Sequence, residues 1–139
     1  MELVIDANIL FAALIKNNLT SELLFKDELD LYAPEFILSE FKKYKNEIKK
    51  KTNRTDSEFE KLLEVFQRRT ELIPCEEIKP FIKQAKQICP DIGDIQYIAL
   101  ALKLRCAIWS NDKELKNQKI VKVYSTSEII NLFPKYKEI

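Results

Sequence analysis

The chain opens with Glu2-Leu3-Val4-Ile5-Asp6, a short and almost continuously apolar run that ends in an acid. Runs of this kind are typical of a central strand in a parallel sheet, which helices cover on both faces. A helix pattern follows directly, because apolar residues recur at helical spacing through residues 7–16. A strand that leads straight into a helix predicts an α/β fold.

The alternation of strand and helix continues along the rest of the chain. Further strand patterns occupy residues 29–33, 71–73, 105–109 and 119–124. Further helix patterns occupy residues 21–26, 34–51, 56–69, 80–88 and 90–104, and residues 125–128 cap a last helix that continues to 133. Pro34 is expected in the first turn of its helix, and Asn17-Asn18 separates the first two helices. This order predicts a three-layer α/β/α sandwich around a mainly parallel sheet of about four to five strands.

Composition limits the chemistry that the chain can perform. Its 139 residues, 46% hydrophobic and 32% charged, fit a single domain over residues 1–139. Lys plus Arg number 23 against 22 for Asp plus Glu, so net charge predicts neither a nucleic-acid nor a membrane partner. The chain has no His, which excludes Ser-His-Asp catalysis, His-bound zinc and a His general base. Gly93 is the only glycine, so a Gly-rich nucleotide-binding loop is excluded as well.

The cysteines and the start of the chain predict a location. Cys75, Cys89 and Cys106 are widely spaced and form no C-x-x-C pair, which indicates free thiols in a reducing compartment. The first residues contain neither a basic segment nor a long apolar run, so we expect no signal peptide and no membrane helix. The expected location is the cytoplasm.

Four acidic residues occupy positions that folding alone does not favour. Asp6 and Asp112 follow two of the predicted strands, Asp94 opens the most apolar helix, and Glu40 lies within an apolar helical stripe. Parallel sheets bind ligands beyond the C-terminal ends of their strands, so we expect the four acids in one cleft. Carboxylates about 5 Å apart repel by about 3 kcal/mol per pair at an effective dielectric of about 20, so a divalent cation is expected among them.

Each of these acids also has a structural explanation. Asp6 and Asp112 are suited to cap a following helix or turn, and Asp91 and Asp94 fit the N-cap and N3 positions of one helix. A charge on the stripe that contains Glu40 is costly unless it pairs with a lysine, reaches water at the flank of the stripe or binds a metal. The occurrence of all four acids at compatible edges of one sheet favours function over capping alone.

In order and spacing, these residues resemble the PIN domain over essentially the whole chain. The matching segments are Leu3-Val4-Ile5-Asp6-Ala7-Asn8, Ser39-Glu40-Phe41, Asp91-Ile92-Gly93-Asp94 with the helix that follows, and Trp109-Ser110-Asn111-Asp112. The chain is similar to single-domain prokaryotic PIN proteins, many of which are VapC-type ribonuclease toxins paired with a small antitoxin. The resemblance implies a nuclease that depends on Mg²⁺ or Mn²⁺ and usually acts on RNA, and it also implies a homodimer.

The resemblance assigns roles to individual residues. The acidic quartet of the family, which is both catalytic and metal-binding, corresponds to Asp6, Glu40, Asp94 and Asp112, and the supporting residues are Asn8, Asp91, Ser110 and Asn111. Asn8 stands where Ser or Thr is frequent in the family.

The chemistry of the residues agrees with this assignment. Oxygen ligands without histidine or paired thiols suit Mg²⁺ or Mn²⁺, and a metal-bound water can attack phosphorus without a protein nucleophile. In this hypothesis Asp6, Asp94 and Asp112 hold the metal directly or through water, while Glu40 binds it or orients the attacking water.

A basic run begins beside Glu40 and is a candidate for binding RNA phosphates. Its first members are Lys42, Lys43, Lys45 and Lys49, and it continues to Arg54. The alternative is a solvated helix face, on which Glu47 pairs with lysines four residues away. Trp109 is expected in the core rather than as a platform for a base.

Other functions stay open on the sequence alone. One alternative is a non-catalytic module, either a PIN scaffold, an RNA-binding module or a phospho-acceptor domain that uses Asp6. Another is a Mg²⁺-dependent phosphatase whose nucleophile is the acid after the first strand. That class typically needs a second Asp two residues later, where this chain has Asn8.

Overall fold

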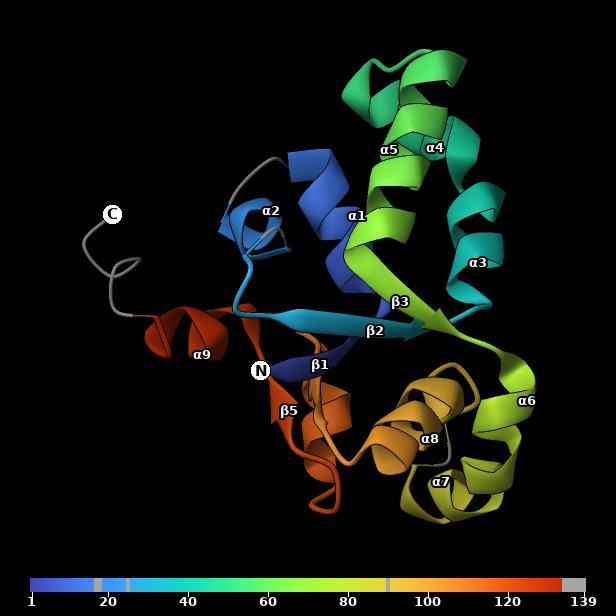
Figure 1. Cartoon of the computed structure of the whole chain (residues 1–139), viewed down its shortest axis with the longest axis vertical. Helices are drawn as coiled ribbons and strands as arrows, with labels where there is room; N and C mark the ends of the chain where they lie inside the picture. Colours follow the sequence, from blue (N-terminus) through green and yellow to red (C-terminus); the bar gives the residue numbers. More distant parts are fainter. Residues whose placement is uncertain (17–18, 25, 90, 134–139) are drawn as a thin grey trace.

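A parallel sheet of five strands lies at the centre of the computed structural model, which describes residues 1–16, 19–24, 26–89 and 91–133 (Figure 1). The strands are β1 (Glu2–Ile5), β2 (Asp30–Pro34), β3 (Thr70–Ile73), β4 (Ala107–Trp109) and β5 (Val123–Tyr124). Every neighbouring pair among them is parallel. The predicted parallel sheet is therefore confirmed, at the upper end of the expected number of strands.

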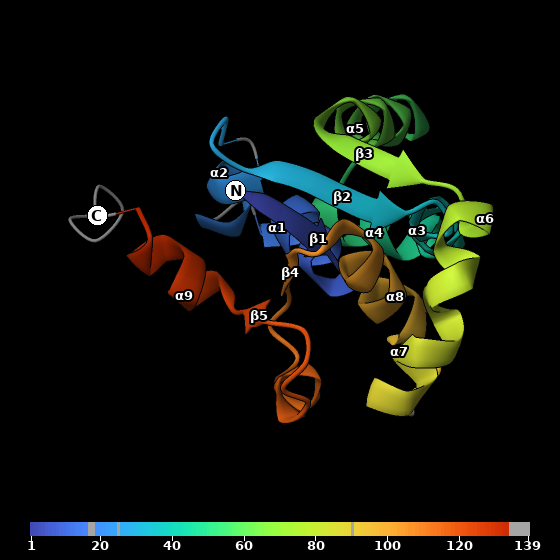
Figure 2. The ribbon, with the colours of Figure 1, turned by 60° about the horizontal axis from the view of Figure 1, so that its bottom comes forward.

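The order of the strands reverses at β1. The sheet runs β3-β2-β1-β4-β5, as Figure 2 shows, so the chain moves outward from β1 to β3 and then returns to the other side of β1. The central residue Val4 pairs with Tyr32 of β2 on one side and with Ile108 of β4 on the other. The C-terminal ends of β1 and β4 therefore form the switch point, where open α/β sheets bind their ligands.

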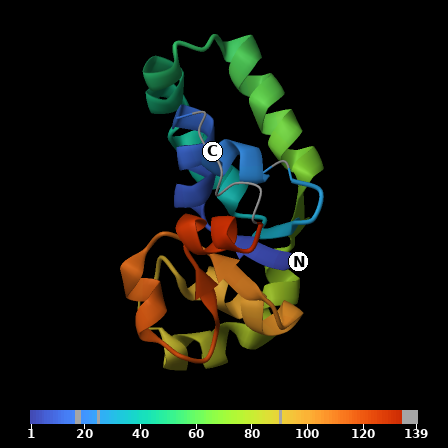
Figure 3. The same ribbon diagram turned by 90° about the vertical axis from the view of Figure 1, so that its left-hand side faces the viewer.

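Helices cover both faces of the sheet and complete the three-layer α/β/α sandwich. One layer contains α1 (Ala7–Lys16), α2 (Leu19–Leu24), α3 (Ile37–Lys43), α4 (Lys45–Thr52) and α5 (Asp56–Arg69). The opposite layer contains α6 (Cys75–Ile78), the 3-10 turn Lys79–Phe81, α7 (Ile82–Ile88) and α8 (Ile95–Leu104). Figure 3 shows the two layers on either side of the sheet. A 3-10 helix (Lys113–Asn117) links β4 to β5, and α9 (Thr126–Asn131) follows β5.

Apolar side chains fill the space between the layers. The interior of β1 is fully buried, and α8 buries residues on nearly all sides, as expected for a helix apolar all round. In the other layer Phe41 and Phe59 stack with ring centroids 4.8 Å apart. Trp109 is completely buried and its Nε1–H donates to Thr126 Oγ1 at 3.1 Å, so it belongs to the core as predicted.

The predicted helix over residues 34–51 is wrong in two respects. Pro34 is the last residue of β2, where it pairs with Ile73, and α3 begins only at Ile37. A proline is tolerated at the end of a strand as well as in the first turn of a helix, so the sequence does not separate the two. Tyr44, at φ −99° and ψ 15°, then interrupts the helix and divides it into α3 and α4.

The predicted helix over residues 90–104 begins later than expected. Residues 91–94 form a turn, in which the Asp94 N–H donates to the Asp91 carbonyl at 3.1 Å and the Gly93 N–H donates to Asp91 Oδ1 at 2.9 Å. Asp94 is therefore the N-cap residue of α8 rather than its N3 residue, and its side chain makes no capping hydrogen bond. The expected cap at Asp91 instead closes the turn.

Other boundaries also differ from the prediction. The strand expected over 119–124 is reduced to β5, because the side chain of Gln118 bonds the backbone of Leu115, Ile120 and Val121 and so holds this segment as a loop. The strand expected over 105–109 begins at Ala107, after Arg105 in the left-handed conformation at φ 54°. The short helix α6 was not predicted, and the helix expected over 80–88 begins as a 3-10 turn.

Some predictions fall on residues outside the described part of the chain. These are the break at Asn17-Asn18 and the start of a helix at Pro90. The helix expected over 21–26 spans Leu19–Leu24, and Ser125 caps a last helix that ends at Asn131 instead of 133. In the described residues, no helix has the length and apolar character needed to cross a membrane.

Candidate functional site

The predicted acids gather at the switch point of the sheet, around a pocket of about 280 Å³. Asp6 reaches it from the end of β1, Glu40 from α3 and Asp94 from the start of α8. We call it the acidic pocket, and its lining residues are Asp6, Ala7, Asn8, Phe36, Glu40, Gly93, Asp94 and Tyr97. Three members of the predicted quartet and Asn8 therefore line one cavity, although they come from three separate parts of the chain.

Asp6 is a buried carboxylate that is held by hydrogen bonds on both oxygens. Only 5% of the residue is exposed. The Ile9 N–H donates to its Oδ1 at 2.9 Å, which is the expected cap of α1, and the Ser110 hydroxyl donates to its Oδ2. Burial raises the pKa of Asp6 above its ordinary value and the charge of Asp112 adds to the rise, while the two hydrogen bonds oppose it.

Ser110 connects Asp6 to Asp112. Its side chain is completely buried, and its Oγ also accepts a hydrogen bond from the Asp112 N–H at 3.1 Å. Asp112 in turn caps the 3-10 helix, because its Oδ1 accepts from the Glu114 N–H at 2.9 Å. Asp112 does not line the acidic pocket, but its charge raises the pKa of both Asp6 and Asp94. Asp112 is therefore close enough to act electrostatically on the carboxyl groups of both Asp6 and Asp94.

Burial and the negative charges of the site both act on the carboxyl group of Asp94. Its pKa is raised from 3.8 to about 6, first by burial and then by the charges of Asp91, Asp112 and Asp6. The start of a helix normally favours a carboxylate, and here burial and the like charges together overcome that preference. Such a site gains stability when a cation enters it.

Glu40 is half-buried and lines the acidic pocket. Ile37, Phe41 and Ile48 of its stripe are buried, whereas Tyr44 is 37% exposed, so the stripe reaches solvent near Glu40. Within the described residues no Lys or Arg forms an ion pair with Glu40. The buried ion pair considered from the sequence is therefore not formed, and a position on the flank of the stripe is what the structure contains.

Two of the predicted supporting residues have structural partners elsewhere. Asn111 joins the end of β4 to the start of α9, because its Nδ2 donates to Thr126 Oγ1 at 3.1 Å and its Oδ1 accepts from the Thr126 N–H at 2.8 Å. Asp91 closes the turn before α8 and is exposed. Neither side chain lines the acidic pocket, although Asp91 lies beside Asp94 in a neighbouring one.

Tyr97 lines the acidic pocket and was not predicted. It is 4% exposed, and its hydroxyl is a buried polar group that has no hydrogen-bond partner of acceptable geometry among the described residues. Burial raises the pKa of Tyr97 strongly, and the charge of Asp6 raises it further. In the sequence Tyr97 resembles any other core residue of an apolar helix, and its position three residues after Asp94 is the only available signal. The backbone of Ala7 acts on this hydroxyl, and Tyr97 shares the lining of the acidic pocket with Asp6, Glu40 and Asp94.

The donor set fits a hydrated hard cation rather than a fully enclosed one. Among the described residues, no three His, Cys, Asp or Glu side chains converge closely enough to hold a metal by themselves. Mg²⁺ keeps several of its waters and often takes only one or two carboxylates from a protein. Asp6 and Asp94 supply such oxygens, and the repulsion that raises the pKa of Asp94 is relieved by a positive charge. The residues present therefore fit Mg²⁺ or Mn²⁺.

Two further pockets share lining residues with the acidic pocket. One, of about 350 Å³, lies between α1 and the α3–α4 segment, and we call it the side pocket. It shares Ala7, Asn8 and Glu40 with the acidic pocket and is completed by Phe11, Tyr44, Glu47, Ile48 and Lys51. The other, of about 330 Å³, shares Asp94 and is lined by residues of α7 and of the 3-10 helix. Residues of the acidic pocket therefore take part in both.

The basic run near the site is partly neutralised within the protein. Lys45 lies 3.6 Å from Asp56 and 3.7 Å from Glu60, and Lys49 also pairs with Asp56, so α4 is tied to α5. Lys42 and Lys43 are exposed. Lys51 pairs with Glu47 at 2.8 Å, as expected for the alternative of a solvated helix face.

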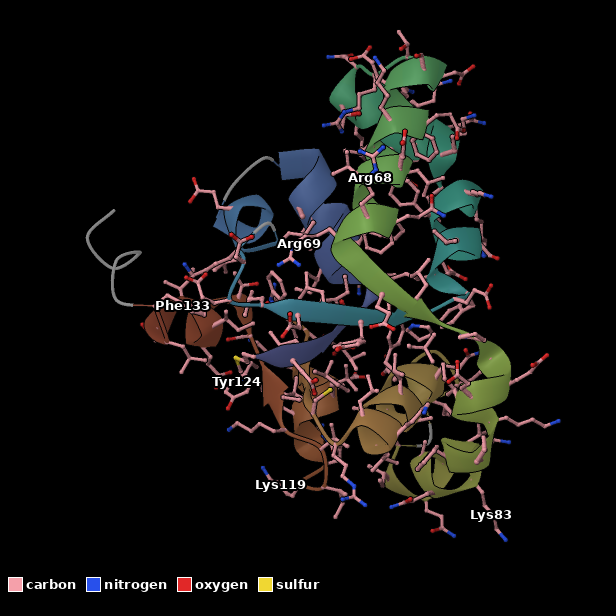
Figure 4. All side chains as sticks on the ribbon, in the orientation of Figure 1. Arg68, Arg69, Lys83, Lys119, Tyr124 and Phe133 are labelled. Carbon is pink, nitrogen blue, oxygen red and sulfur yellow. The ribbon has the colours of Figure 1, made fainter. Side chains whose placement is uncertain are left out.

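The basic pair Arg68-Arg69 lies away from the acidic pocket. Figure 4 labels both residues on α5. They end α5 immediately before β3 begins, at the N-terminal end of a strand, whereas Asp6 follows the C-terminal end of the parallel strand β1. Arg69 donates to the Leu29 carbonyl at 2.7 Å, and Arg68 pairs with Glu64. In the described structure, both arginines therefore bond to nearby parts of the fold and not to the acidic pocket.

Comparison with known proteins gives the family. The sequence model of the PIN domain family matches residues 4–129 of this chain. No curated protein sequence matches the chain. Among solved structures, a chain of the VapBC2 complex from Rickettsia felis, bound to a DNA fragment from its promoter, is similar in fold with a TM-score of 0.68. It is 18% identical in sequence, and the match covers 90% of this chain and 98% of that one. The sequence match over residues 4–129 places this chain in the PIN domain family.

Proposed function

We propose that this protein is a metal-dependent endoribonuclease, in which residues 1–139 act as one domain. The observation that carries the proposal is the acidic pocket, where Asp6, Glu40 and Asp94 meet at the switch point and where burial, followed by like charges, raises the pKa of Asp94 to about 6. PIN domains are generally nucleases that use divalent metal ions, and the family match supports the same chemistry here.

In this proposal Asp6 and Asp94 hold Mg²⁺ or Mn²⁺, with Asp112 acting directly or through water. When bound, the ion would activate water and stabilise the negative charge that develops on a phosphodiester. Glu40 would orient the attacking water from its half-buried position. Ser110 would hold Asp6 and the backbone of Asp112 in fixed relative positions, since its hydroxyl forms a hydrogen bond with each. The Tyr97 hydroxyl would donate to the carboxylate of Asp6 or to a water beside it.

The partner and the location are parts of the same proposal. We infer that a small antitoxin protein binds this chain, because the chain resembles VapC-type toxins and is similar in fold to a chain of a VapBC2 complex. Cys75, Cys89 and Cys106 are free thiols, which supports the proposal that the protein is located in the reducing environment of the cytoplasm. A homodimer remains part of the proposal, and sedimentation of the purified protein tests it.

Cleavage of a random-sequence RNA pool tests the activity. We expect cleavage with Mn²⁺, none with excess EDTA, recovery when Mn²⁺ is restored, and loss in Asp6→Asn and Asp94→Asn. Asp30→Asn is the matched control, because Asp30 is an exposed Asp at the opposite end of the sheet. Full activity of Asp94→Asn would overturn the metal assignment, and an inert wild-type protein would favour a non-catalytic scaffold. Single-stranded DNA of the same sequences distinguishes RNA from DNA as the substrate.

A further inference from the structure

The side pocket has an aromatic wall that is rigid and partly open to solvent. Phe11 packs edge-to-face against Tyr44, with ring centroids 5.6 Å apart and an angle of 79° between the rings. Phe11 also stacks on the fully buried Phe41 at 6.2 Å. Tyr44 is 37% exposed, and it lies where the chain passes from α3 to α4. Lys43 Nζ lies over the Tyr44 ring, 5.5 Å from its centroid, so a flat ligand that stacks on that face would displace the lysine. An exposed aromatic ring that is held from behind by a packed cluster is a suitable surface for stacking a flat ligand.

The charges around the side pocket decide what kind of flat ligand it accepts. Glu40 and Glu47 both line it, and its single lysine, Lys51, already pairs with Glu47 at 2.8 Å. The lining residues alone therefore carry a net negative charge, which disfavours a phosphate group, and Lys43 at the Tyr44 ring reduces this repulsion. A neutral ring that carries hydrogen-bond donors is not disfavoured, because the carboxylate of Glu47 and the side chain of Asn8 can accept its protons.

We propose that the side pocket binds one nucleobase of the RNA substrate, next to the phosphate that is cleaved at the acidic pocket. This inference rests on the proposed nuclease function and names a specificity site for it. The two pockets share Ala7, Asn8 and Glu40, so a base in one and its neighbouring phosphate at the other are within the reach of a single nucleotide. Stacking on aromatic side chains with hydrogen bonds to the base edge is the usual way in which proteins read unpaired RNA.

The carboxylates also predict which bases are accepted. Adenine, cytosine and guanine carry exocyclic amino groups, which donate to a carboxylate. Uracil has no amino group, and its single ring N–H lies between two carbonyl oxygens that Glu47 would repel. We therefore expect discrimination against uridine at one position beside the cleavage site.

Sequencing of the cleaved ends of a random RNA pool tests this assignment. Wild type should discriminate against uridine on one side of the cut, and Tyr44→Ala should lose that bias and reduce kcat/KM by about tenfold, the usual scale of one base–aromatic stack. Tyr44→Phe should keep both. Val65→Ala is the matched control, since Val65 is a similarly exposed apolar residue on α5, 38% exposed, and lines neither the side pocket nor the acidic pocket.

A binding measurement separates this inference from the nuclease activity. In EDTA, adenosine and cytidine should shift the NMR signals of the Tyr44 and Phe11 rings, and uridine should shift them less. Such shifts in a protein that cleaves no RNA would refute the nuclease and keep the base site. If the protein cleaves RNA without any base bias and no nucleoside shifts these signals, the base site is refuted. The side pocket would then accommodate a side chain of a partner protein instead.

Discussion

Replacement of Asp94 by Asn should stabilise the protein without metal and destabilise it relative to wild type when metal is added. Asp94 has a pKa of about 6 in the folded state, against an ordinary value of 3.8. The folded state therefore binds its proton more tightly than the unfolded chain does. The favourable contribution of this proton is fully present below pH 3.8 and is lost as the pH rises through about 6. Above that pH the ionised group destabilises the fold.

The size of the effect follows from the difference between the two pKa values. A rise from 3.8 to about 6 corresponds to about 3 kcal/mol between the protonation states. Solvent screening at this partly exposed position leaves roughly 1–2 kcal/mol. An Asn side chain has a similar shape and carries no charge at any pH. In EDTA, Asp94→Asn should therefore be more stable than wild type by about 1–2 kcal/mol above pH 7, and the difference should shrink toward zero near pH 4.

Urea unfolding, followed by circular dichroism between pH 4.5 and 8, measures this difference. Addition of Mn²⁺ at 100 times its Kd should stabilise wild type by about 2.7 kcal/mol and the variant much less, so the order of stability should reverse. Asp30→Asn serves as the control and should show neither effect. A variant that is less stable than wild type in EDTA at pH 7.5 would refute the argument from like charges. Equal stabilisation of both proteins by Mn²⁺ would refute Asp94 as a ligand.

Three further substitutions test other contacts. Ser110→Ala removes a buried hydroxyl and leaves Asp6 Oδ2 without its donor. The free energy of unfolding in urea should therefore fall by about 1–3 kcal/mol relative to wild type. Ser110→Thr keeps a hydroxyl, so its free energy of unfolding should fall less. Thr55→Ala removes the capping box of α5, which should lower the unfolding free energy by about 0.5–2 kcal/mol in the same assay, and an unchanged midpoint would contradict the cap. Asp56→Asn releases Lys49 from its partner, so RNA should bind more tightly to this variant at low salt in a filter assay. Unchanged affinity would exclude this part of the basic run from the RNA interface.

The parts of the site that could be predicted are those fixed by local patterns. Asp6 follows an apolar run and precedes a helix pattern, and the rule that parallel sheets bind ligands at their C-terminal edge is enough to place it. Asp112 follows β4 for the same reason, and its role as a cap was also expected. Asp94 was predicted at the N3 position of its helix but is the N-cap residue. The difference arose because a turn that precedes a helix and the first turn of a helix have the same acidic pattern. The free carboxylate of Asp94 became visible only when α8 was found to begin at Ile95.

The parts that could not be predicted depend on contacts between distant segments. Asn111 bonds Thr126, fifteen residues away, and no local pattern connects them. Lys49 pairs with Asp56 only because α4 and α5 pack as a hairpin. Tyr97 lies on an apolar helix where any large side chain would fit, so the burial of its hydroxyl at the acidic pocket is visible only after the helix is placed against β1.

Capping and catalysis are compatible roles for Asp6, although the sequence presents them as alternatives. An ionised carboxylate offers about four acceptor sites on its two oxygens. Among the described residues, the Ile9 N–H occupies one of these sites and the Ser110 hydroxyl another, on different oxygens. The backbone of Asn8 adds a further hydrogen bond to the carboxylate, so both oxygens are held and at least one of the acceptor sites is left for a cation. These bonds favour the ionised form against the burial that opposes it. The helix cap is therefore part of what would make Asp6 an oriented metal ligand.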